Sequence, residues 1–127
     1  MAKLRAFVVE DSPVILENLI QTIEEIVGVE VVASAQDEQS ALAWMDARTD
    51  GCDVVIIDVF LRSGSGLGVL EGMMSYTSPP GRIVLTNYAT ADIRSRCQAL
   101  GAEVVFDKSH EIEDLLRWLA KQARSIH

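Results

Sequence analysis

The chain has 127 residues, of which 49% are hydrophobic and 24% charged, and 11 Lys and Arg stand against 19 Asp and Glu. This length and composition predict a single globular domain over residues 1–127, with a core large enough to need neither disulfides nor a structural metal. The net charge of −8 argues against nucleic acids and anionic membranes as main partners, since phosphate groups would be repelled. The two cysteines match no secreted disulfide framework, and no apolar run approaches the ~20 residues of a membrane helix, so we expect a cytoplasmic protein.

Five short runs rich in β-branched residues are predicted to be strands. Several are apolar at consecutive positions, which is typical of strands covered on both faces. The runs are Leu4–Val9, Glu30–Ala35, Asp53–Asp58, Arg82–Thr86 and Glu103–Phe106.

A helical pattern follows each strand. The first helix is predicted to begin with Ser12 as N-cap and Pro13 in the first turn, and to stop at Gly28. The strict alternation of strands and helices predicts a doubly wound parallel α/β sheet with helices on both faces, a three-layer sandwich without an output domain. The other helices are predicted over Asp37–Arg48, Leu67–Tyr76, Ala91–Leu100 and Glu111–Ala123, the last with Ser109 near its cap.

Polar residues stand at the carboxyl ends of four predicted strands, where open α/β sheets bind their ligands. Glu10 and Asp11 follow the first strand, Asp58 ends the third, Thr86 ends the fourth and Lys108 follows the fifth. Three carboxylates at one edge repel each other, and Mg²⁺ is the cation that best offsets them while leaving positions for phosphate oxygens.

This arrangement favours phosphoryl chemistry. Asp58 is the candidate nucleophile, because a carboxylate can attack phosphorus to give an acyl phosphate. Lys108 and Thr86 are the candidates for binding the phosphoryl oxygens. Each residue alone has an ordinary explanation as a helix cap or a solvated charge, and only their joint placement at the strand ends favours a site.

These residues resemble the receiver domain of two-component response regulators, and the resemblance spans essentially the whole chain. It extends to Ser65-Gly66-Leu67 at the start of the third helix and to Gly101-Ala102 before the fifth strand. The resemblance implies a flavodoxin-like fold with five helices and strand order 2-1-3-4-5.

The same resemblance implies a signalling switch and not an enzyme with an external substrate. Asp58 would accept a phosphoryl group from a histidine kinase or phosphotransferase, with Thr86 and Lys108 assisting. Asp11 and Asp58 would bind Mg²⁺ directly, Glu10 through water, and the carbonyl of Phe60 would be a further ligand. The surface of the fourth helix, fifth strand and fifth helix would then change for a downstream protein or a second copy.

The chain departs from the family pattern at four positions. Val105 stands where Tyr or Phe is usual, three residues before the lysine, and Ser109 stands where proline often follows it. Arg62 replaces a common proline, and Asn87 replaces a smaller residue.

Two other functions, a phosphatase or mutase and a flavin carrier, fit the sequence less well than the switch. A phosphatase or mutase of the haloacid-dehalogenase type would need an aspartate at position 60, where the chain has Phe60. A flavin carrier would need a phosphate-binding first loop, whereas Glu10 and Asp11 repel phosphate. We expect His110 and His127 to be solvated, Trp44 and Trp118 to pack in the core, and the arginines at 94, 96, 117 and 124 to lie on solvated helix faces.

Overall fold

Five parallel strands form one sheet in the order β2-β1-β3-β4-β5. The structure is a computed structural model that describes residues 3–47 and 51–125. The observed order confirms the predicted flavodoxin-like fold, and its direction of winding reverses between β1 and β3. The strands are β1 (Arg5–Val9), β2 (Glu30–Ala35), β3 (Val54–Ile57), β4 (Gly81–Thr86) and β5 (Val104–Asp107).

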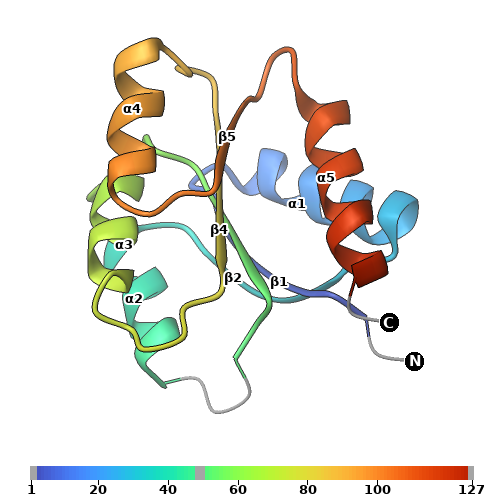
Figure 1. The fold of residues 1–127 in the computed structure, drawn as a ribbon, viewed down its shortest axis with the longest axis horizontal. Helices are drawn as coiled ribbons and strands as arrows, with labels where there is room; N and C mark the ends of the chain where they lie inside the picture. The colour runs from blue at the N-terminus through green and yellow to red at the C-terminus, as the bar shows by residue number, and fades with distance from the viewer. Residues whose placement is uncertain (1–2, 48–50, 126–127) are drawn as a thin grey trace.

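The helices cover both faces of the sheet (Figure 1). Helices α1 and α5 lie on one face, and α2, α3 and α4 lie on the other. Within residues 3–47 and 51–125, no helix combines the length and the apolar character needed to span a membrane. The helices are α1 (Pro13–Thr22), its π-helical continuation η1 (Ile23–Val27), α2 (Glu38–Ala47), α3 (Gly66–Met73), α4 (Ala91–Ala99) and α5 (Ile112–Ser125).

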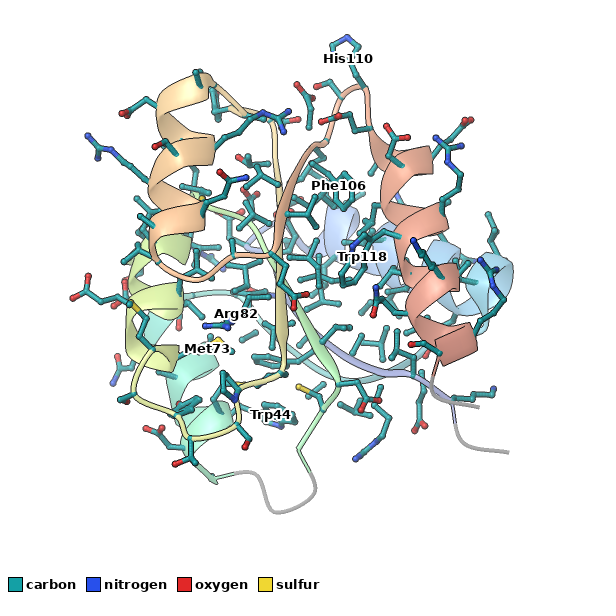
Figure 2. The ribbon with its side chains drawn as sticks, in the orientation of Figure 1. Trp44, Met73, Arg82, Phe106, His110 and Trp118 are labelled. Atoms are coloured by element: carbon teal, nitrogen blue, oxygen red, sulfur yellow. The ribbon has the colours of Figure 1, made fainter. Side chains whose placement is uncertain are left out.

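The side chains of alternate strand residues form two separate apolar layers, one on each face of the sheet, because successive side chains of a strand point to opposite faces. Phe7 belongs to the layer under α2 to α4, where its ring stacks on Trp44 with centroids 4.2 Å apart. Phe106 and Trp118 belong to the layer under α1 and α5 (Figure 2). Both tryptophans therefore pack against the core, as predicted.

The first helix differs from its prediction as one regular helix up to Gly28. Ser12 caps α1 as expected, since its hydroxyl accepts the amide of Ile15 at 3.4 Å. The α-helical pattern ends at Thr22 and widens into η1, which stops at Gly28 with a φ of 75°. The wider turn carries Glu24, whose carboxylate accepts the amide of Val31 in β2.

Two other helix boundaries were wrong. Helix α3 ends at Met73 and not at Tyr76, because Tyr76 sits in the following turn, where its hydroxyl donates to Asp46 at 2.6 Å. Helix α5 continues to Ser125 and not only to Ala123, and Ser109, predicted near its cap, donates its hydroxyl to Asn87 at 3.2 Å. The predicted end of the second helix at Arg48 lies outside the described residues, and no strand limit differs from its prediction by more than one residue.

Candidate functional site

The carboxyl ends of β1, β3 and β5 bring the predicted polar residues around one cleft at the point where the sheet reverses. Glu10, Asp11, Asp58 and Lys108 line it, together with the ring of Phe60. The cleft has a volume of about 160 Å³, which suits an ion and a small group better than a cofactor that needs ~300 Å³ or more.

Three carboxylates converge in this cleft. Glu10, Asp11 and Asp58 each offer an oxygen within 4.8 Å of the other two. Glu10 and Asp58 are buried and Asp11 is half-buried, so one side of the group remains open to solvent. Oxygen donors of this charge, with room for water, fit Mg²⁺.

Lys108 reaches the carboxylates from the loop after β5. Its Nζ donates to Glu10 Oε1 at 2.5 Å and to Asp58 Oδ2 at 2.8 Å. Burial alone would lower the pKa of Lys108, but the hydrogen bonds and charges of Asp58 and Glu10 outweigh it and raise that pKa. Lys108 therefore places a positive charge directly beside the Asp58 carboxylate.

Burial raises the pKa of Glu10, although the hydrogen bonds from Lys108 and from the amide of Ser12 act in the opposite direction. The Ser12 amide donates to Glu10 Oε2 at 3.0 Å, so the turn that begins α1 also orients this carboxylate. A second cation beside Glu10 would further compensate its buried charge.

Gly66 packs closely against the backbone of Asp58 and Val59. The amide of Gly66 donates to the carbonyl of Val59 at 2.8 Å, which folds the start of α3 onto the end of β3. A Cβ at position 66 would lie 2.2 Å from the carbonyl oxygen of Asp58. Only glycine allows this approach, so the Ser65-Gly66 pair predicted from the resemblance supports the position of Asp58 directly.

Thr86 lies at the same sheet edge but does not line the cleft. Its side chain is fully buried, and its hydroxyl accepts the amide of Tyr88 at 3.2 Å. Its carbonyl accepts the amide of Lys108 at 2.8 Å. Thr86 is thus tied to both the loop before α4 and the loop before α5.

An aromatic pair borders the cleft on the side of α4. The rings of Phe60 and Tyr88 meet edge to face with centroids 4.8 Å apart, and the two residues are 49% and 59% exposed. Both residues also line the cleft beside Asp58.

Arg94 and its partner Glu111, which contact the loops around the site, were missed. Arg94, expected on a solvated helix face, is half-buried and donates to Glu111 and to two backbone carbonyls. Its position in the helical pattern of α4 gave no signal, because only the folded loop brings its acceptors together. Arg96 and Arg117 are exposed and pair within their own helices, as expected for solvated faces, and His110 projects away from the molecule (Figure 2).

Known proteins support this interpretation of the fold. The sequence is 29% identical over 115 residues to a protein-glutamate methylesterase/protein-glutamine glutaminase of Paramagnetospirillum magneticum, covering 88% of this chain but 29% of that protein. The chain therefore spans less than a third of that curated relative.

Solved structures share the fold at lower identity. The response regulator domain of Thermotoga maritima CheB is 21% identical with a TM-score of 0.79, and the match covers 98% of this chain and 96% of that one. A chain of the CheX-CheY-BeF3-Mg+2 complex from Borrelia burgdorferi is 18% identical with a TM-score of 0.83, covering 94% of this chain and 88% of that one.

The family model described as the response regulator receiver domain matches residues 6–120. That range contains β2 to β5, all of β1 except Arg5, and every residue around the cleft. The chain belongs to the response regulator receiver domain family.

Proposed function

We propose that the chain is a phosphorylation-controlled switch in which Asp58 accepts a phosphoryl group from the phosphohistidine of a histidine kinase or phosphotransferase. The observation that carries the proposal is the bridge of Lys108 Nζ to both Glu10 and Asp58, with Asp11 beside them. A carboxylate placed between a buried ammonium and two further carboxylates is suited to phosphoryl transfer and has no evident role in packing.

The transfer is a displacement at phosphorus. A carboxylate oxygen of Asp58 forms the new P–O bond, the bond between phosphorus and the donor nitrogen breaks, and its electron pair remains on the imidazole. Lys108 then exchanges its bond to Asp58 for one to a phosphoryl oxygen. Thr86 must give up the Tyr88 amide before its hydroxyl turns to another phosphoryl oxygen.

Asp11, Asp58 and the carbonyl of Phe60 would hold Mg²⁺, with Glu10 acting mainly through water. The ion supplies positive charge that offsets the phosphoryl oxygens as the new bond forms. The clustered carboxylates support this assignment, because without a cation their charges exceed the single ammonium of Lys108.

The output surface we propose comprises α4, β5 and α5, acting on a downstream protein or a second copy of the chain. Thr86 is bonded to the two loops that precede α4 and α5. A movement of its side chain therefore releases the Tyr88 amide in the loop before α4, while its backbone carbonyl still accepts the Lys108 amide in the loop before α5.

Acetyl phosphate with Mg²⁺ tests the proposal. Intact-mass measurement should show one added phosphoryl group that hydroxylamine removes, as expected for an acyl phosphate. Asp58→Asn should abolish it, whereas Asp92→Asn, an exposed carboxylate of α4, should be labelled like wild type. Equal labelling of Asp58→Asn would exclude Asp58 as the acceptor.

The metal assignment has its own measurement. Asp11→Asn should weaken Mg²⁺ binding about tenfold or more in calorimetric titration, because one charged ligand is lost. Unchanged affinity in this variant would place the ion elsewhere.

A further inference from the structure

The side chain of Arg94 joins three segments around β5. From α4, its Nε donates to the carbonyl of Ala89 at 3.1 Å, in the loop before the helix. Its Nη1 donates to the carbonyl of Val105 in β5 at 2.7 Å, and its Nη2 donates to Glu111 Oε1 at 2.9 Å. One planar guanidinium thus satisfies acceptors that lie far apart in sequence, which a single ammonium cannot do.

Glu111 continues this connection into the loop that carries Lys108. The same Oε1 atom that binds Arg94 accepts the amide of Asp107 at 2.7 Å, and the amide of Glu111 donates back to the carbonyl of Asp107 at 2.7 Å. The carboxylate of Asp107 accepts the amide of Ser109 at 2.7 Å. Lys108 is therefore enclosed by hydrogen bonds on both sides.

Three residues near this connection depart from the family pattern. Val105 is one of them and is buried in the apolar layer with Val84 and Cys97. Ser109 and Asn87, two further departures, bond to each other across the site at 3.2 Å. The loops before α4 and α5 are therefore joined by this bond as well as by the contacts of Arg94 with Ala89 and Glu111.

We propose that Arg94 and Glu111 are positioning residues that hold the Lys108 loop at the phosphorylation site and couple it to α4. This inference rests on the proposed function of Asp58. Neither residue touches the carboxylates of the cleft. Glu111 fixes the backbone from which Lys108 extends. Arg94 fixes the carbonyl of Ala89, which follows Thr86 by three residues.

The position of Lys108 bears directly on the rate of transfer. An ammonium stabilises the phosphoryl charge only when it is already in place, and small displacements of such groups are costly. Loosening residues 107–111 should therefore slow phosphorylation even though Asp58 and the carboxylates remain intact.

The test is the rate of phosphorylation by acetyl phosphate at saturating Mg²⁺, measured on folded variants of the full chain. Arg94→Ala and Glu111→Ala should each be slower by roughly threefold to tenfold, and the double variant no slower than the worse single variant. Glu111→Gln should recover most of the rate, since its amide oxygen still accepts from Asp107 and Arg94. Arg94→Lys should not.

Two arginines serve as matched controls, because Arg96 lies on α4 with Arg94, Arg117 lies on α5 shortly after Glu111, and both pair with exposed neighbours. Arg96→Ala on α4 and Arg117→Ala on α5 should leave the rate unchanged. Amide exchange of residues 107–111 provides a second measurement, and it should be faster in Arg94→Ala than in either control.

The outcomes separate the two proposals. A wild-type chain that takes up no phosphoryl group would refute the function of Asp58. Amide exchange of residues 107–111 would then be the remaining test of whether Arg94 and Glu111 hold that loop. A labelled wild type with Arg94→Ala equally fast would refute the positioning role. Glu111→Gln as slow as Glu111→Ala would also refute it, because the hydrogen bonds would not be what matters.

Discussion

Helices α4 and α5 flank the same strand, β5, but are attached to the molecule by different forces (Figure 1). Helix α5 fully buries Leu115 and Leu119, and Leu116 and Trp118 are partly buried against the same apolar layer. In α4, Cys97 is the one buried residue within the described part of the chain.

The difference indicates which helix is held less firmly by apolar burial. Apolar burial holds α5 through many contacts that water cannot replace. The polar helix α4 depends more on Arg94, whose hydrogen bonds each contribute only about 1 kcal/mol net. If phosphorylation moves Thr86 as we propose, α4 should respond more readily than α5, in line with the low opening energies expected of switching elements.

Truncating a buried side chain in each helix gives the largest expected effect and tests whether apolar burial holds α5 more firmly than α4. Leu119→Ala should lower the free energy of unfolding by about 2–5 kcal/mol, because it removes a fully buried side chain and leaves a cavity. Cys97→Ala should cost only about 1 kcal/mol, since less volume is lost. Urea denaturation measures both, and equal losses would contradict the proposed difference in attachment.

Amide hydrogen exchange compares the opening free energies of the two helices without mutation. The amides of α4 should exchange through local opening at roughly 2 kcal/mol below the global free energy of unfolding, whereas those around Leu115 should exchange near the global value. Exchange of both helices at the global value would show that α4 is as firmly held as α5.

The sequence predicted the sheet and the site better than it predicted the loops. Consecutive apolar residues mark each buried strand, and the strand ends brought Glu10, Asp11, Asp58 and Lys108 together as expected. These predictions succeeded because parallel strands place their carboxyl ends at one edge whatever the details of packing.

The failures have a common physical origin in contacts between distant residues. Tyr76 matched the helical pattern, yet its hydroxyl binds Asp46 from a turn. Arg94 matched a solvated position, yet its acceptors come from two loops and β5. Periodicity reports which face of an element is apolar and contains no information about such long-range polar partners.

The aromatic pair beside α4 gives a third prediction. Phe60 and Tyr88 border the cleft beside Asp58, and the ring of Phe60 offers no hydrogen bond to orient an attacking water. Replacing them with Phe60→Asn and Tyr88→Lys should speed loss of the phosphoryl group about 10-fold, or ~1.4 kcal/mol of barrier. A time course after removal of acetyl phosphate measures this. A wild type that already decays as fast as the double variant would show that the rings do not exclude water.

The smallest expected effect is the pH dependence of the bond between α4 and the loop before α5. The hydrogen bonds from Arg94 and from the amide of Asp107 lower the pKa of Glu111 below 4.5, while the charge of Asp107 opposes them. The stabilisation is therefore complete above pH 4.5 and is lost as the pH falls through the lower pKa of the folded state. Because both side chains are about one-third exposed, it should amount to only about 0.5 kcal/mol.

Glu111→Gln isolates this contribution. Its unfolding free energy should lie below that of wild type near neutral pH, and the gap should close as the pH is lowered within the range where both remain folded. Asp114→Asn on α5 is the control, because Asp114 pairs with Arg117 on an exposed face and such pairs contribute little. A gap for Glu111→Gln that stays constant with pH would mean that the carboxylate charge does not stabilise the connection to α4, and that only the packing of the side chain does.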